Sequence, residues 1–197
     1  LNALRRAGRA PDSPPYPWID RAAMISLGAV VLCDLAAPNS AAAGVVAALA
    51  AAATFARLAR WHGVATLGQP ILWVLHLAYL LMPASLAVKA VFLLTDALWA
   101  ATWLHLQAAG AIALMIMAVM TRATLGHTGR DLVAPPLAVV AYVLIPLAAL
   151  ARAFGAEVMP YTAALAVAGT AWVAAFAAYL AAFAPMLVTP RPDGKPG

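Results

Sequence analysis

The sequence is short of charge and of cysteine. Only 10% of its 197 residues are charged, whereas 65% are hydrophobic. Such a balance cannot be arranged as one water-soluble domain, so the chain belongs in a lipid bilayer. Its one cysteine, Cys33, excludes both an intrachain disulfide and a multi-cysteine cluster, and we interpret it as a packing residue.

Several signatures of chemistry are missing as well. The sequence offers no carboxylate pair for acid–base work, no nucleophile with an adjacent base and no phosphate-binding loop. Hydrolase and kinase chemistry can therefore be set aside. The net charge of +5 is interpreted as loop charge that orients a membrane protein, so no nucleic-acid partner is expected.

Long apolar segments are what the sequence does have. A helix needs about 20 such residues to cross the ~30 Å hydrocarbon core of a bilayer. Breaks at proline, glycine, asparagine and charged residues delimit six segments, at residues 20–37, 40–58, 69–94, 98–120, 132–152 and 158–187. The first is the weakest, because Asp34 lies near its end. The sequence thus predicts an all-α, polytopic transmembrane helix bundle of about six spans.

Polar residues frame this transmembrane domain, which we place at residues 19–188. Residues 1–18 form a lead-in rich in proline and arginine, and residues 189–197 form a polar tail. The lead-in lacks the pattern of a signal peptide. A chain that begins at Leu1 is expected to be a fragment of a longer protein.

The basic residues predict the orientation of the bundle. With six spans, ten of the twelve lysines and arginines fall on the side shared by both termini, and only Lys89 and Arg152 fall on the other. The positive-inside rule makes the basic side cytoplasmic, so both termini are expected there. Five spans would scatter the same charges over both sides.

Two histidines, His76 and His105, lie inside apolar segments. Ionisable residues inside a span are costly and usually functional, so ligation of a metal or proton relay competes here with a packing role. At a rise of ~1.5 Å per residue the two imidazoles differ in height by roughly 10 to 17 Å. Since two ligands of one metal must approach within about 4 Å, they are not expected to share an iron.

Aromatic residues surround His76 along the helix. Trp73 and Tyr79 lie about one turn to either side of it on one face, where they could form a wall of a haem slot. The alternative is an aromatic belt at the membrane interface. His62 follows Trp61 in a short loop, and we interpret it as an interfacial anchor.

A polar stretch at residues 121–130 places His127 between two glycines and two arginines. Gly126 and Gly129 permit backbone turns, so we expect the helix to break and the imidazole to be aimed at a ligand. Arg122 and Arg130 either anchor the inside face or bind haem propionates or another anion. Met115, Met117 and Met120 suit Cu(I) by chemistry, but the first two lie about 200° apart around a helix and are expected to be packing residues.

Residues 120–130, together with residues 72–79 and His105, resemble the C-terminal region of the NnrS family. The resemblance implies a multi-pass protein of the bacterial inner membrane that binds haem, of b type, and copper. It also implies a role in nitric oxide metabolism or in resistance to nitrosative stress, with nitric oxide or an iron-nitrosyl group as a ligand. The chain departs from the family pattern at Asp131, where family members usually have proline.

By the same resemblance, His76, His105 and His127 are the haem or metal ligands, and Arg122 and Arg130 contact the cofactor or an anion. Family members usually carry a further set of spans ahead of this region, so an N-terminal transmembrane half of the same protein is an expected partner. A second function class stays open, a transporter or scaffold whose buried histidines relay protons or bind a passing metal ion. Tight, stoichiometric cofactor would separate the two, and the sequence leaves open whether any substrate is turned over.

Overall fold

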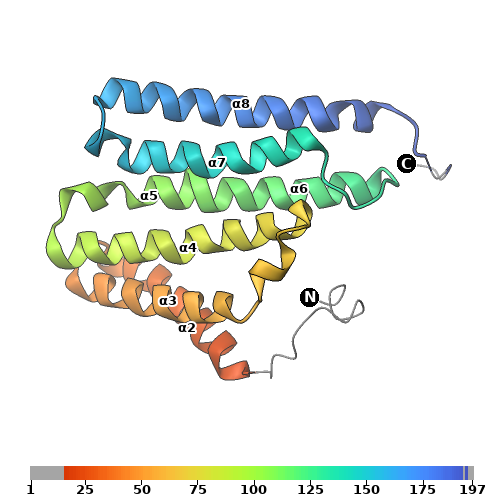
Figure 1. Cartoon of the computed structure of the whole chain (residues 1–197). Helices are drawn as coiled ribbons and strands as arrows, with labels where there is room; N and C mark the ends of the chain where they lie inside the picture. The colour runs from red at the N-terminus through yellow and green to blue at the C-terminus, as the bar shows by residue number, and fades with distance from the viewer. Residues whose placement is uncertain (1–15, 193, 195–197) are drawn as a thin grey trace.

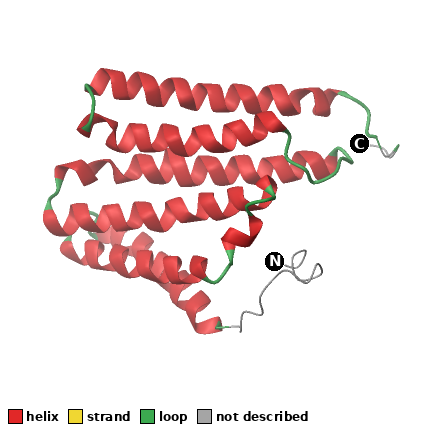
Figure 2. Cartoon of the chain, in the orientation of Figure 1, coloured by secondary structure: helices red, strands yellow, loops and turns green. Residues whose placement is uncertain are grey.

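The computed structural model describes residues 16–192 and residue 194, and the greater part of that range is helical (Figure 2). Six long helical stretches follow one another along it. They are α2 (Pro17–Ala36), α3 (Ala41–Ala59), α4 (Pro70–Thr95), a composite stretch from Leu98 to His127, α7 (Pro136–Phe154) and α8 (Tyr161–Val188). No strand occurs in the range that the structure describes. The predicted all-α bundle is confirmed.

The composite stretch changes helix type along its length. It consists of η2 (Leu98–Thr102), α5 (Trp103–His105), the π-helical η3 (Leu106–Ile112) and α6 (Ala113–His127). Two short 3₁₀ segments, η1 (Gly63–Thr66) and η4 (Gly155–Glu157), lie in loops. Because a π-helix is rare and is found often at functional sites, its position directly after His105 is noteworthy.

Five of the six stretches are long and apolar enough to cross a membrane: α3, α4, Leu98–His127, Pro136–Glu157 and α8. The sixth, α2, lies outside this set and carries Asp20, Arg21 and Asp34. The chain is therefore a multi-pass membrane protein, and the helix expected from the sequence to be the weakest span is the least apolar one.

The helices lie side by side in chain order, with α8 at one edge of the bundle and α2 and α3 at the other (Figure 1). Consecutive helices pack against each other, as in α2 with α3, α3 with α4, and α7 with α8. Short loops make such neighbours antiparallel. We call the end where α2 begins and α8 ends the basic end, and the other the opposite end. Arginines at the basic end are Arg21, Arg57, Arg60, Arg122, Arg130 and Arg191.

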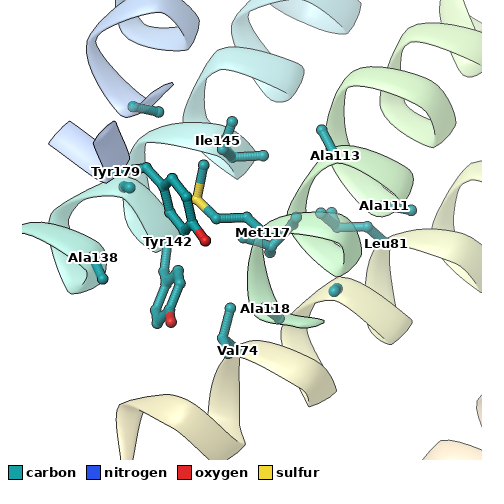
Figure 3. Packing of buried hydrophobic residues seen from close by; sticks show 14 of the residues in the cluster. Val74, Leu81, Ala111, Ala113, Met117, Ala118, Ala138, Tyr142, Ile145 and Tyr179 are labelled. Atoms are coloured by element: carbon teal, nitrogen blue, oxygen red, sulfur yellow. The ribbon is translucent and has the colours of Figure 1, made fainter. Parts of the chain in front are cut away.

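The main core lies between α4, the composite stretch, α7 and α8. Figure 3 shows Met117, Tyr142 and Tyr179 meeting there. The Tyr142 hydroxyl donates a hydrogen bond to Thr121 Oγ1 at 2.7 Å. Small residues let the backbones approach closely, since a Cβ added to Gly110 would lie 3.0 Å from the side chain of Ala149. The two helices that carry His76 and His105 are part of this packed core.

Two ion pairs attach α2 to its neighbours, one near each end. Asp20 accepts from Arg57 Nε of α3 at 2.8 Å. Asp34 pairs with Lys89 of α4, whose side chain is only 3% exposed. The Lys89 ammonium also lies 4.6 Å from the centroid of the Trp103 ring. Lys89 is thus a buried cation that depends on Asp34 and Trp103 for its stabilisation.

The expected helix break ahead of His127 is wrong. Helix α6 continues through Gly126 and ends at His127. Threonine hydroxyls bond back to carbonyl groups one turn earlier, from Thr121 to Met117 at 2.9 Å and from Thr128 to Thr124 at 2.7 Å, so these polar side chains are satisfied within a helix. The chain turns two residues later, at Gly129, which has a φ of 68°.

Candidate functional site

A cavity of about 710 Å³ lies at the basic end, between the end of α3, η1 and the first turns of α4. Its volume falls within the range of about 300 to 1,000 Å³ that small-molecule sites occupy. Its walls are apolar apart from His62 and His76, and Trp73 contributes an aromatic surface. Val64 and Leu67, which are 81% and 65% exposed, border it on the outside. We call it the histidine cavity.

The His76 ring is held in place by its own helix. Its Nδ1 lies 3.0 Å from the carbonyl oxygen of Leu72, one turn earlier in α4. When Nδ1–H donates to that carbonyl, Nε2 carries the lone pair that a metal needs. The Trp61 ring meets the imidazole edge-on, with centroids 5.9 Å apart. The Nδ1 atom of His76 therefore has a hydrogen-bond partner, as the nitrogen that does not bind the metal typically has in a histidine ligand.

The loop before η1 is folded closely over this ring. A Cβ added to Gly63 would lie 3.0 Å from His76 Cδ2 and 3.2 Å from Cγ, so only glycine fits there without a shift. His62, directly before it, has φ 50° and ψ 44°, in the left-handed region that residues with a side chain seldom adopt. His62 and His76 thus line the same cavity, although only an interfacial anchoring role was expected for His62 from its position beside Trp61.

The two aromatic residues predicted to flank His76 lie in different surroundings. Trp73 lines the histidine cavity, and its ring meets Tyr142 edge-on at 5.9 Å. Tyr79 is buried behind Trp61, with ring centroids 4.5 Å apart. Arg57 lies over the Trp61 ring at 5.1 Å and donates to the Tyr79 hydroxyl at 3.4 Å. Tyr79 therefore supports Trp61, which in turn packs against His76.

His105 lines a second, smaller cavity of about 300 Å³, formed with α7 and α8. Arg152 and Trp172 contribute to its lining, and the small residues Ala109 and Gly169 leave space between the helices. The π-helix η3 begins at the next residue. His105 is the eighth residue of a stretch that starts at the opposite end, whereas His76 is the seventh residue of a helix that starts at the basic end. The two histidines thus border different cavities.

His127 lies apart from both cavities. It is the last residue of α6 and is exposed, and its carbonyl oxygen accepts a hydrogen bond from Arg191 Nη1 at 2.8 Å. Arg122 is half-buried on the same helix. The polar stretch that the sequence singled out therefore borders neither the His76 cavity nor the His105 cavity.

Arg130 holds two segments of the chain together. Its guanidinium donates to the carbonyl oxygens of Thr128 and Met186, at 3.3 Å each, and to the hydroxyl of Thr189 at 2.9 Å. These contacts join the loop after α6 to the end of α8. Arg130 therefore has a structural role, because it connects these two segments.

The number of metal-ligating side chains that lie together bears on which cofactor the chain can hold. Within residues 16–192, no group of three or more His, Cys, Asp or Glu side chains is placed to hold a metal ion. A free transition-metal ion usually takes about three or four protein donors. Haem iron takes four nitrogens from its own ring and needs only one or two protein ligands. One or two histidines, as in the histidine cavity, match the number of protein ligands that haem iron takes, and the described residues contain no group of three such side chains that would hold a free metal ion.

Sequence reasoning did not find the pairing of Asp34 with Lys89, nor the place of His62 on the cavity wall. A signal for the ion pair existed, because two opposite charges inside apolar segments require each other. Both lie towards the opposite end of the bundle. No comparable signal exists for His62, because its position depends on how the loop folds over α4.

These features define a multi-pass helical membrane protein with an apolar cavity, lined by two histidines, at one end of the helix bundle. The chain matches the family model described as NnrS protein over residues 2–191, and it belongs to the NnrS family. No curated protein and no solved structure matches the chain. The resemblance seen in the sequence is confirmed, and family membership indicates a membrane protein related to nitric oxide.

Proposed function

We propose that the protein binds haem in the histidine cavity and takes part in nitric oxide metabolism or in protection against nitrosative stress. The observation that carries the proposal is His76, an imidazole whose Nδ1 is engaged by Leu72 and whose ring borders an apolar cavity of about 710 Å³. The haem would be of b type, because covalent attachment of the c type uses a Cys-x-x-Cys-His motif and Cys33 is the sole cysteine.

The residues of the chain have separate tasks in this proposal. His76 offers Nε2 as the ligand, and the Leu72 carbonyl fixes the tautomer and orientation of the ring. Trp73 and the aliphatic wall exclude water and present flat apolar surface to a planar group. Bound haem would supply an iron that takes up nitric oxide.

The membrane orientation belongs to the proposal as well. The arginines gathered at the basic end support a cytoplasmic location for that end, in a bacterial inner membrane. The histidine cavity would then lie near the cytoplasmic face and His105 near the outer one. A haem site near the cytoplasm is accessible to nitric oxide from either side, because a small neutral gas crosses the bilayer.

Copper, which the family resemblance also implies, is not assigned a site. His105 and His127 remain predicted metal ligands, with Arg122 and Arg130 as predicted contacts of a cofactor or anion. None of them joins a cluster of three His, Cys, Asp or Glu donors in the described part of the chain. The proposal therefore rests on haem at His76.

The test is the absorption spectrum of the purified full-length protein and of its His76→Leu variant. Leucine is tolerated in a span, so the variant should insert normally. Loss of an outer partner of a ligand alone lowers affinity about 10- to 100-fold, so we expect loss of the ligand itself to lower haem affinity by at least roughly tenfold and the purified variant to contain less haem. Nitric oxide should shift the spectrum of the wild type.

The matched control is His105→Leu, which removes an imidazole from the other cavity. It should keep the band that His76→Leu loses. Normal haem content in His76→Leu would refute the assignment. Normal haem and metal content in all of the His76, His105 and His127 variants would favour the transporter or scaffold instead.

A further inference from the structure

We infer that the cavity beside His105 is a binding site for an anionic phospholipid, whose phosphate is held by Arg152 and whose acyl chain follows the apolar wall. The cavity is the space of about 300 Å³ between the composite stretch, α7 and α8, and both His105 and Arg152 line it. The inference is independent of haem, because the histidine cavity is formed by other segments of the chain.

The first observation is the charge of Arg152, which no acidic side chain offsets. Lys89 and Arg152 are the two basic residues of the opposite end. Lys89 pairs with Asp34, but in the described part of the chain no Asp or Glu pairs with Arg152. Its guanidinium carbon lies 5.9 Å from the centroid of the Tyr161 ring. A bound anion would supply both the missing charge and oxygen acceptors for the guanidinium N–H groups.

The second observation is the depth of Arg152 in the bundle. It lies in the last turn of α7, close to the helix end at Phe154. At a rise of ~1.5 Å per residue, Arg152 is about 3 Å from that end. The ends of a membrane-spanning helix lie near the level of the lipid headgroups. Arg152 is therefore placed where a lipid phosphate is available to it.

The third observation is the course of the cavity. Its residues on α8 run from Leu165 to Val173, about 12 Å along the helix. Since α8 begins at Tyr161 at the opposite end, the cavity leads from the level of the headgroups into the apolar part of the bundle. Its walls are apolar apart from His105, Arg152 and Trp172. Inorganic phosphate would have to leave water to enter this space, whereas a lipid brings its own apolar part.

The fourth observation is that the cavity is open towards the bilayer. Figure 1 shows α8 at one edge of the bundle. Leu165 and Val173 line the cavity and are nevertheless 46% and 65% exposed. In a membrane, exposed apolar side chains of a span face the acyl chains of lipids. A Cβ added to Gly169, between these two residues, would have no atom within 4 Å, so space for a chain exists there.

The experiment titrates the full-length protein in detergent with dioleoylphosphatidylglycerol and counts the bound lipids by native mass spectrometry. Dioleoylphosphatidylcholine serves as the comparison, because it carries the same chains and a phosphate attached to a cation that Arg152 repels. We expect one tightly bound phosphatidylglycerol per wild-type chain and weaker binding of phosphatidylcholine. Arg152→Gln should weaken binding of phosphatidylglycerol by roughly fivefold, the contribution of one arginine near a membrane surface.

Two matched controls separate the site from general effects. Arg21→Gln removes the same charge from an exposed position on α2, so binding should be unchanged. Gly169→Leu fills the cavity and should weaken binding while Arg152 is kept. Its control is Gly28→Leu on α2, where an added Cβ also has no atom within 4 Å, so lipid should bind as in the wild type.

Two results would overturn the inference. The first is equal affinity for phosphatidylglycerol in the wild type and in both the Arg152→Gln and Gly169→Leu variants. The second is displacement of the bound lipid by an equal concentration of inorganic phosphate, which would assign the site to the free anion.

Discussion

Single side chains around the histidine cavity have little freedom, and that restriction gives the site its geometry. His76 is tied to Leu72 at one nitrogen and is packed by Trp61 and Gly63 on its ring. A metal ligand benefits from such support, because affinity depends on the partners that orient it as well as on the ligand itself.

Gly63 provides a test of that restriction. In Gly63→Ala the new Cβ would lie 3.0 Å from His76 Cδ2, so either the ring or the loop must move. We expect haem affinity, measured by titration of the apoprotein, to fall by roughly tenfold, in the range seen when the support of a ligand is lost.

The control for this prediction is Gly68→Ala in the same loop region. A Cβ at Gly68 would have no atom within 4 Å, so haem affinity should be unchanged. Equal affinity in the Gly63→Ala and Gly68→Ala variants would show that the close approach of the loop to His76 has no part in binding.

At the scale of elements, α2 is the helix that depends most on its neighbours. It is the least apolar of the six helical stretches, and two carboxylates attach it to α3 and α4. The two pairs differ in burial. Side chains in the Arg57–Asp20 pair are 28% and 54% exposed, whereas Lys89 is 3% and Asp34 36% exposed. Burial makes the second pair the stronger determinant of where α2 lies.

We therefore expect Asp34→Asn to destabilise the folded protein much more than Asp20→Asn. Removing one partner of a fully buried pair costs about 3 to 5 kcal/mol, and the partial exposure of Asp34 brings the expectation to roughly 1 to 3 kcal/mol. An exposed pair such as Asp20 with Arg57 contributes about 0 to 1 kcal/mol. Unfolding in mixed detergent micelles measures both values.

A double variant tests whether the loss of stability comes from leaving the Lys89 charge without a partner. Asp34→Leu combined with Lys89→Leu removes both charges and leaves none uncompensated, so it should recover most of the stability lost in Asp34→Asn. Equal unfolding free energies for Asp34→Asn and Asp20→Asn would contradict the role given to the buried pair.

For the whole molecule, the number of helices and their approximate positions could be predicted from the sequence, because length and hydropathy dominate in a bilayer. The end of α6 at His127 could not be predicted in this way. The Thr121 and Thr128 hydroxyls donate to backbone carbonyls one turn earlier, so a stretch that is polar by hydropathy is still compatible with a helix. His76 could be singled out as an ionisable residue in a span. Its neighbour His62 could not, because only the tertiary fold brings the loop over α4.

The positions of the candidate ligands relative to one another could also be predicted only in part. The sequence treats His76, His105 and His127 as comparable, whereas the structure gives the first two separate cavities and leaves His127 exposed. Depth along a helix predicts that His76 and His105 lie apart. Depth along a helix does not predict which cavity each histidine lines, because the cavities are formed by the packing between helices.

The most direct test of the account is the number of haem groups per chain when the histidine cavity is filled and both of its imidazoles are kept. Ala59 lines the cavity and Ala56 lies on α3 outside its lining. In the full-length protein, Ala59→Trp should lose most of the haem that the wild type holds at this site, whereas Ala56→Trp should keep it. Full haem content in Ala59→Trp would contradict the claim that this cavity holds the cofactor.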